Sequence, residues 1–437
     1  MTRLPSLELR RLDSAIDLVA LFRALSARHE ELFWLDAGAG AAVGWSVLGV
    51  GEIDRRGPAD VRLDVAPPVV HDGPPFRGGW VGWLDYESGA AAAGAPAARS
   101  EGGPAWLRVT AAVAVDHATG AVWQLGESLA DLRASLSERS ETKRVERAQR
   151  PVETTPATAS ARHTPGEYAA LIQRCRDAIR AGDAYQLCLT TRFQIDGSHD
   201  DVETYLRLRT ATPAHHGGFV RIGGRALLSA SPETFLHASS GRIRTRPIKG
   251  TRPRGADPAS DDALAAELLA SEKERAENVM IVDLMRNDLS RVCVPGTISV
   301  DGLWQVESYP AVHQLVSTVS GRPAEGLTVG RLWDAAFPAG SMTGAPKLSA
   351  MTLLHELEGG APRGVYSGCF GYVGADGAMD LAMVIRSILI DGDRAVVGAG
   401  GGITWGSDAA SEVEEVTTKA RAPLAALGAE LPEAWRS

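Results

Sequence analysis

An α+β fold is what the sequence predicts, and three observations are compatible with it. Short apolar runs that end in glycine turns fill residues 1–135, and another hairpin is expected between residues 227 and 251. Apolar residues recur at helical spacing in two further stretches, 166–182 and 261–292, where Ser260 or Asp261 would cap the second helix. Strands and helices do not alternate regularly, as they would around a parallel sheet. These patterns agree with an α+β protein without selecting one architecture.

Changes of composition divide the chain into three parts. Residues 1–135 form a β-rich region that holds six tryptophans, which can stack on a ligand but more often fill a core: Trp34, Trp45, Trp80, Trp83, Trp106 and Trp123. Residues 136–165 are polar and rich in threonine and proline, as expected of a linker. Residues 166–437 form the third part, whose first helix has Gly182 as a plausible C-cap.

Composition also excludes several classes of protein. The formal net charge of −9 disfavours a nucleic-acid-binding surface and favours a small-molecule or protein partner. Nowhere do ~18 apolar residues run together, and the N-terminus carries charges where a signal peptide needs an apolar run. The four cysteines lack a Cys-x-x-Cys pair and are expected to be reduced and mostly buried in a cytoplasmic protein: Cys175, Cys188, Cys293 and Cys369.

One carboxylate and one lysine stand on opposite arms of the hairpin expected between residues 227 and 251. The turn is predicted at 239–241, with Glu233 before it and Lys249 after it. Lys249 could be a nucleophile and Glu233 a proton donor, since four arginines between residues 244 and 254 would favour the neutral amine. A solvated basic strand with a stray carboxylate is the alternative, and a nucleic-acid-binding stripe is a weaker one. Spacing alone leaves these alternatives open.

Two expected helices each carry a pair of glutamates three residues apart, which places each pair on one helix face. Glu274 and Glu277 form the first pair, and Glu412 and Glu415 form the second. Two such pairs can supply oxygen ligands to Mg²⁺, which favours a few carboxylates completed by waters and a substrate oxygen. Taken singly, each pair is better explained as a solvated helix face.

Eight segments, taken together and in order, resemble the chorismate-utilising enzymes. They read PIKGTRPRG, SEKERAENVMIVDLMRNDLSRV, VHQLVSTVSG, FPAGSMTGAPK, RGVYSGCFGYV, VIRSILI, AGGGI and EVEEVTTKAR. The similarity covers about residues 160–425, and GGWVGWLDYE extends it to the N-terminal region. This family includes anthranilate synthase component I, aminodeoxychorismate synthase component I, isochorismate synthase and salicylate synthase. The resemblance implies the anthranilate synthase component I fold, in which two antiparallel sheets pack as a β-sandwich surrounded by helices.

Four markers resemble the aminodeoxychorismate synthase branch of this family. Lys249 stands in PIKGT, where anthranilate synthases have alanine, and Gln186 stands where isochorismate and salicylate synthases have a water-activating lysine. MRNDL and SMTGAPK resemble the same branch, and FWLDAG replaces the LLES signature of tryptophan-inhibited anthranilate synthases. The resemblance implies conversion of chorismate and ammonia to 4-amino-4-deoxychorismate, a precursor of 4-aminobenzoate for folate. An anthranilate-type synthase is the nearest alternative, and a non-catalytic chorismate-binding relative is a distant one.

The resemblance also implies roles for individual residues. Glu233 would protonate the C4 hydroxyl of chorismate, and Lys249 would add at C2 before ammonia enters at C4. Mg²⁺ would hold the ring carboxylate and be bound by the four glutamates, with Glu277 and Glu412 as the first choices for direct ligands. The enolpyruvyl carboxylate would be held by Arg386, Tyr366, Gly400 and Gly402. The other expected substrate-binding residues are Gly250, Thr251, His313, Ser341 and Lys419.

The sequence also indicates the source of ammonia. No cysteine stands in the Gly-x-Cys-x-Gly elbow of a glutaminase, so ammonia is expected from solution or from a separate glutamine amidotransferase subunit.

The chain departs from the family pattern in three places. The segments TWGSD and EVEEV and the residue Thr212 differ from the usual family residues. These departures have no physical explanation in the sequence.

Overall fold

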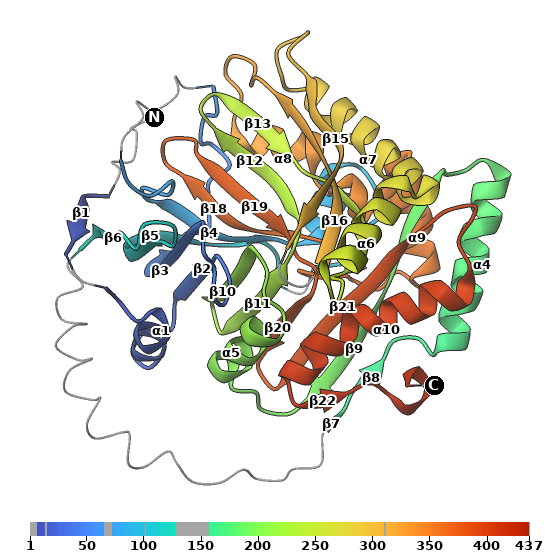
Figure 1. Cartoon of the computed structure of the whole chain (residues 1–437), viewed down its shortest axis with the longest axis horizontal. Helices are drawn as coiled ribbons and strands as arrows, with labels where there is room; N and C mark the ends of the chain where they lie inside the picture. Colours follow the sequence, from blue (N-terminus) through green and yellow to red (C-terminus); the bar gives the residue numbers. More distant parts are fainter. Residues whose placement is uncertain are drawn as a thin grey trace.

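Two antiparallel sheets that share one long strand, β5 (Ala105–Asp116), form the centre of the molecule (Figure 1). The computed structural model describes residues 7–13, 15–64, 72–100, 102–127, 157–309 and 312–436. In these ranges β5 pairs with β3 (Trp45–Ile53) on one side and with β4 (Gly79–Leu84) and β6 (Val122–Gly126) along the other. The two sheets diverge from this shared strand.

The first sheet runs from the N-terminal strands to the strands that line the cavity described below. After β3 its strands are, in order, β2 (Leu32–Asp36), β10 (His216–Ile222), β11 (Arg225–Ser231), β20 (Ser387–Asp391), β21 (Arg394–Ile403) and β9 (Gln186–Asp196). Short strands extend its edges: β1 (Leu9–Leu12) beside β6, and β8 (Ser160–Ala161) and β17 (Gly344–Ala345) beside β9.

The second sheet carries the region around Lys249. After β4 its strands are, in order, β18 (Cys369–Gly374), β19 (Met379–Met383), β12 (Thr234–Ser239), β13 (Arg242–Thr245), β16 (Val312–Gly321) and β15 (Ser299–Ser308). The strand β14 (Ile248–Pro253) pairs with the other end of β16, beyond β13. A separate parallel pair joins β7 (Ala157–Thr158) to β22 (Ala429–Glu430).

A buried apolar cluster lies between the two sheets and holds them together. Phe33, Val220 and Leu227 come from the first sheet, and Trp83 and Phe370 come from the second. Removing this apolar area from water is the main source of stability for such a packing. The predicted α+β architecture of two packed antiparallel sheets is therefore confirmed.

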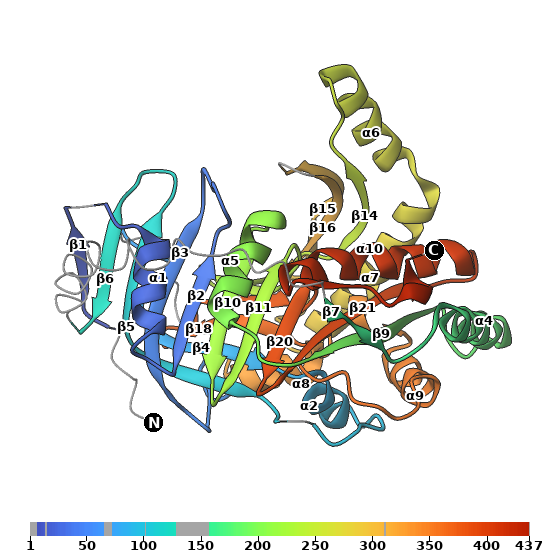
Figure 2. The ribbon, with the colours of Figure 1, turned by 90° about the horizontal axis from the view of Figure 1, so that it is seen from below.

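Helices cover the outer faces of both sheets. They are α1 (Leu18–Ser26), α2 (Tyr86–Ala92), α4 (Pro165–Ala181), α5 (Asp201–Ala211), α6 (Pro258–Ala270), α7 (Glu272–Ser290), α8 (Val329–Ala336), α9 (Lys347–Leu357) and α10 (Ala409–Ala426), with the 3₁₀ turns η1 (Gly340–Met342) and η2 (Glu433–Trp435). Buried residues of α1, α4, α5, α9 and α10 pack on the first sheet, and those of α7 and α8 pack on the second. The expected C-cap of α4 is confirmed, because Gly182 is left-handed with φ 89°. Figure 2 shows α6 projecting from the body of the molecule.

The single helix predicted over residues 261–292 is wrong. The chain forms two helices because Ser271 adopts an extended backbone (φ −63°, ψ 109°) and its side chain accepts a hydrogen bond from the Glu274 N–H. The predicted caps of the first helix are also wrong. Asp257 caps α6 by accepting from the backbone N–H groups of Ala259 and Ser260.

The predicted turn at residues 239–241 is confirmed, but the hairpin is shorter than expected. It joins only β12 and β13, with His237 opposite Arg244 and Ser239 opposite Arg242. Proline interrupts the ladder at Pro232 and Pro247, since it has no N–H to donate. Glu233 and Lys249 therefore lie outside the hairpin arms, in the segments that follow these two prolines.

In the N-terminal region, the expectation of a tryptophan core holds for four of the six residues. Trp34, Trp80, Trp83 and Trp106 are buried, whereas Trp45 and Trp123 are partly exposed. The division into three parts stays a prediction. Residues 136–156 of the expected linker lie outside the described residues, and residues 157–165 contain β7, β8 and the start of α4. No helix of the described chain is long and apolar enough to cross a membrane.

Candidate active site

A cavity of about 520 Å³ opens where β14, α7, α10 and β21 meet the loop around η1. All but one of the residues proposed for catalysis, substrate binding or metal binding line it; the exception is His313. They come from eight segments between residues 233 and 419, so the tertiary fold brings them together.

Glu233 is the buried carboxylate of this cavity. It lies between β11 and β12 with 8% of its surface exposed, and Ser341 Oγ donates a hydrogen bond of 2.9 Å to its Oε1. Burial raises the pKa of Glu233 to about 7, although the Ser341 hydrogen bond and the charges of Lys249 and Lys419 each lower it. A carboxyl with such a pKa is partly protonated near neutral pH and can donate a proton there.

Lys249 is the second residue of β14 and is largely buried. Its Nζ lies 3.9 Å from Oε2 of Glu277, and the two side chains are 13% and 12% exposed. A Cβ built at Gly402 would lie 3.0 Å from this Nζ and 2.5 Å from Nε2 of Gln186. A side chain at Gly402 would therefore crowd the lysine and the glutamine, and glycine leaves the space open.

Carboxylates offset the charge of three of the four arginines that were expected to repel a proton from Lys249. Arg246 forms an ion pair with Glu307, Arg252 pairs with Glu267 and Glu274, and Arg254 pairs with Asp261. The nearest ion-pair partner of Lys249 itself is Glu277. The sequence showed the cations of this stretch but not the carboxylates, which come from other elements.

The four glutamates of α7 and α10 form one acidic wall of the cavity. Glu412 is 4% exposed, accepts a hydrogen bond of 2.8 Å from Ser407 Oγ and lies 3.9 Å from Nζ of Lys273. Burial raises the pKa of both Glu277 and Glu412, and neighbouring carboxylates raise it further. This burial does not fit a solvated helix face for either residue. Among the described residues, no three acidic, histidine or cysteine side chains converge closely enough to hold a metal ion unaided.

A second wall is built from backbone and from one arginine. The aromatic ring of Tyr366 packs on Gly398, where an added Cβ would lie 2.1 Å from the ring. Lys419 Nζ donates to the Gly400 carbonyl over 2.8 Å. Arg386 has a positive φ of 53°, and burial lowers its pKa. A left-handed, partly buried arginine is costly, and such backbone strain often occurs at ligand-binding sites.

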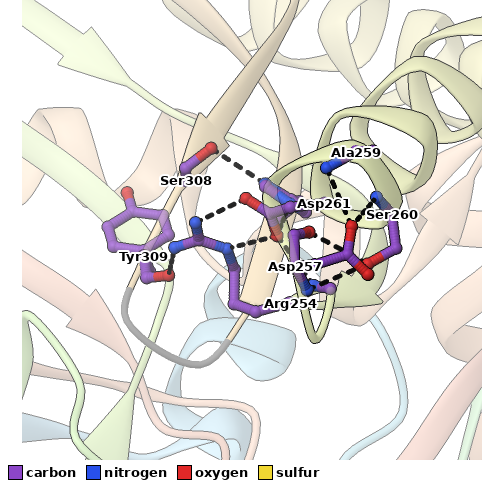
Figure 3. A network of polar contacts seen from close by, with 9 residues as sticks. Arg254, Asp257, Ala259, Ser260, Asp261, Ser308 and Tyr309 are labelled. Atoms are coloured by element: carbon purple, nitrogen blue, oxygen red, sulfur yellow. Dashed lines mark hydrogen bonds and ion pairs between the residues drawn. The ribbon is translucent and has the colours of Figure 1, made fainter.

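The expectation that His313 contacts substrate is wrong. Val312 and Gln314 line the cavity, and side chains alternate along β16, so His313 faces the other way. Its ring nitrogens bond to Ser308 Oγ (2.8 Å) and to Asp261 Oδ1 (2.9 Å). Figure 3 shows the polar network around Asp261, whose carboxylate also accepts a hydrogen bond from the Arg254 guanidinium.

Two buried glutamines, Gln314 and Gln186, have side-chain atoms without a hydrogen-bond partner among the described residues. Gln314 was missed by the sequence reasoning; it is 5% exposed, and its Oε1 has no hydrogen-bond partner within the described chain. No signal in the sequence separates Gln314 from His313, its neighbour in the motif VHQLVSTVSG; the structure places Gln314 opposite Thr251 of β14. Gln186 is fully buried beside Gly402, and neither atom of its amide has a partner among the described residues.

Known proteins resemble this chain over most of its length. Residues 58–425 match the model of a family described as chorismate binding enzyme. An aminodeoxychorismate synthase of Streptomyces pristinaespiralis is 42% identical over 369 residues, which is 80% of this chain and 51% of that protein. Anthranilate synthase component 1 of Streptomyces coelicolor is 39% identical over 381 residues, which is 81% of this chain and 73% of that protein.

A solved structure extends the comparison to the fold. Anthranilate synthase component I from Streptococcus pneumoniae superposes with a TM-score of 0.71 and 28% sequence identity, covering 97% of this chain and 93% of that one. The chain spans about half the length of the aminodeoxychorismate synthases of Streptomyces that it matches.

Proposed function

The chain belongs to the family of chorismate-binding enzymes, and from this premise we propose that it forms 4-amino-4-deoxychorismate from chorismate and ammonia. The observation that carries the proposal is a lysine, Lys249, in the same cavity as the buried acid Glu233. An anthranilate-type synthase is the second candidate, because a relative with that name is 39% identical to this chain over 381 residues.

In the proposed reaction Glu233 donates a proton to the C4 hydroxyl of chorismate, which then leaves as water. The neutral amine of Lys249 adds at C2 as this bond breaks, so both ring double bonds shift and the lysine occupies C2. Ammonia attacks C4, both double bonds shift back, and the lysine is expelled. The proton that ammonia loses balances the one that Glu233 gave. The enolpyruvyl group stays on the ring throughout.

The second wall of the cavity suits the enolpyruvyl carboxylate of the substrate. The planar fork of Arg386 can pair bidentately with the enolpyruvyl carboxylate, and the Tyr366 hydroxyl and the backbone at Gly400 and Gly402 can complete its hydrogen bonds. Gln314 and Thr251 are further candidates for polar contacts on the opposite side. A cavity of about 520 Å³ is large enough for a substrate of this size.

The acidic wall fits Mg²⁺, which we propose as the metal of this enzyme. Its donors are carboxylate oxygens from two facing helices, led by Glu277 and Glu412, and Mg²⁺ commonly uses one or two protein carboxylates with waters and substrate oxygens. When bound, the ion would supply positive charge that holds the ring carboxylate. The raised pKa values of these two glutamates agree with a site whose charge is balanced only when a cation is present.

Replacing Glu412 by glutamine should weaken the binding of Mg²⁺ by at least about tenfold, because one charged ligand is lost. Titration calorimetry of the purified protein with MgCl₂, with and without chorismate, measures this directly. Glu414→Gln is the matched control, since Glu414 is an exposed neighbour on α10. Equal Mg²⁺ affinity of the Glu412 variant and the wild type would contradict the metal assignment, as would full turnover in excess EDTA.

We propose that ammonia reaches the cavity from solution or from a separate glutamine amidotransferase subunit. All four cysteines are free and buried, which removes the nucleophile that a glutaminase needs and agrees with our proposal of a cytoplasmic location. Folate synthesis is the pathway we propose for the product.

Incubation of the purified protein with chorismate, Mg²⁺ and an ammonium salt tests the function. The expected product, found by liquid chromatography and mass spectrometry, is the 4-amino compound, whereas glutamine alone should give none. A 2-aminobenzoate product would favour the anthranilate-type candidate. Turnover with glutamine would refute the separate amidotransferase.

A further inference from the structure

A buried ion pair lies directly behind the cavity and outside the machinery described so far. Arg363 Nη2 lies 2.7 Å from Glu358 Oε1 and its Nε lies 2.9 Å from Oε2, and the two side chains are only 2% and 3% exposed. Bidentate pairing of this kind fixes the guanidinium in one orientation. Burying two charges is costly, so such a pair is poor evidence for stability and better evidence for a precise spatial requirement.

The remaining hydrogen bonds of this pair reach two walls of the cavity. Arg363 Nη1 donates to the Met342 carbonyl over 2.8 Å, and Nη2 donates to the Cys188 carbonyl over 2.9 Å. Glu358 Oε1 accepts from the backbone N–H and the hydroxyl of Thr190, each over 2.9 Å. Met342 and Cys188 both line the cavity. One side chain therefore ties the η1 loop to strand β9.

The η1 loop carries the residue that touches the buried acid. Ser341 immediately precedes Met342, and its hydroxyl donates to Glu233 over 2.9 Å. The loop is a single 3₁₀ turn of three residues, too short to hold its own shape rigidly. The chain just after it is held to β9 by backbone bonds, since the Cys188 N–H donates to the Thr343 carbonyl over 2.8 Å and β17 pairs with β9. The bond from Arg363 to the Met342 carbonyl is the side-chain anchor nearest to Ser341, and it ties the 3₁₀ turn itself to β9.

We propose that Arg363, oriented by Glu358, is a positioning residue that holds Ser341 against the proton donor Glu233. The inference rests on the proposed function, in which Glu233 protonates the leaving hydroxyl. Arg363 acts through the Met342 carbonyl and the Ser341 hydroxyl, and it does not line the cavity itself.

The proposal has a signature in the dependence of rate on pH. The groups that act on Glu233 are Ser341 from the η1 loop, Lys249 from β14 and Lys419 from α10, and all three lower its pKa. Loosening the loop weakens only the Ser341 hydrogen bond, so the pKa of Glu233 rises. Glu233 acts only when protonated, and the rate falls at high pH as it loses its proton. A higher pKa of Glu233 therefore moves this alkaline limb of the rate profile to higher pH, although the maximal rate is lower.

The test is the Arg363→Lys variant, which keeps the charge but cannot reach two carbonyls and a carboxylate at once. We expect kcat to fall about tenfold while KM for chorismate changes less than about threefold, as for a lost transition-state interaction. The alkaline limb should move up by about half a pH unit, equivalent to a weakened hydrogen bond. Free ammonia is held constant at every pH, so that its own titration does not enter.

Three further variants distinguish a positioning role of Arg363 from a general loss of stability. Ser341→Ala should move the limb in the same direction, and adding Arg363→Lys to it should move the limb no further. Glu358→Gln, which leaves Arg363 less firmly oriented, should move the limb as well and serves if Arg363→Lys does not fold. Arg209→Lys is the matched control: Arg209 pairs with buried Asp36 far from the cavity, so it should lower the melting temperature without moving the limb.

The outcomes distinguish this inference from the proposed function. Wild-type protein that makes no amino product from chorismate and ammonia would overturn the function. Wild-type activity together with an unmoved limb in folded Arg363→Lys or Glu358→Gln would overturn the positioning role. A limb that moves equally in the Ser341→Ala background would show that Arg363 does not act through Ser341.

Discussion

Lys249→Ala is expected to lose most of the 4-amino product, by on the order of a thousandfold, because it removes the proposed covalent nucleophile. If the amine of Lys249 occupies C2 during the reaction, ammonia can enter only at C4. The family resemblance implies alanine at this position in the rival, anthranilate-forming branch. The variant should therefore open C2 to ammonia and gain some 2-amino product. Chromatographic separation of the two amino isomers measures both changes.

The matched variant Lys249→Arg separates charge from nucleophilicity. Arginine keeps the positive charge beside Glu277 but does not become a neutral amine in a protein, so it should be as inactive as alanine for the 4-amino product. Both variants should fold, because the side chain faces a cavity and not the packed core. Formation of the 4-amino isomer at the wild-type rate by either variant would exclude Lys249 as the nucleophile.

Glu233→Gln is expected to lower kcat by about 100- to 10,000-fold, the usual contribution of a general acid. Glutamine has a similar shape and can still accept the hydrogen bond from Ser341, so binding of chorismate should change little. The rate of single-turnover product formation and the KM for chorismate, measured side by side, separate these two effects.

The pH dependence of the wild type gives an independent check on Glu233. Burial raises its pKa from the ordinary value of 4.5 to about 7, so the carboxyl stays protonated below that pH and loses its proton above it. At constant free ammonia the rate should therefore fall as the pH rises through about 7. This descending limb should be absent from Glu233→Gln. A limb that persists unchanged in the variant would assign the titration to another group.

Patterns within short segments predicted much of the fold correctly. The turn at Ser240 and Gly241 follows from residues that tolerate positive φ, and the end of α4 follows from Gly182. The buried tryptophans of the first 135 residues follow from their size and setting. The same local reasoning failed at Ser271, where one polar side chain stops a helix whose periodicity continues on both sides.

The set of candidate site residues was also within reach of the sequence, because motifs spread from residue 233 to residue 419 resemble one family. The exception is instructive: His313 and Gln314 are neighbours in one motif, yet only Gln314 faces the cavity. Which face of β16 turns inward depends on how β14 and α6 pack against it, through contacts such as His313 with Asp261.

By itself, then, the sequence determined the family, and with it the α+β class, through motifs that resemble known members, and its residue types determined the chemical groups available for the reaction. Only the tertiary structure decided the electrostatic state of those groups. Glu233 is a weak acid because it is buried, three of the four arginines near Lys249 are ion-paired, and Arg363 meets Glu358 behind the cavity. Burial and ion pairing depend on distances between segments far apart in the chain, and folding alone sets those distances.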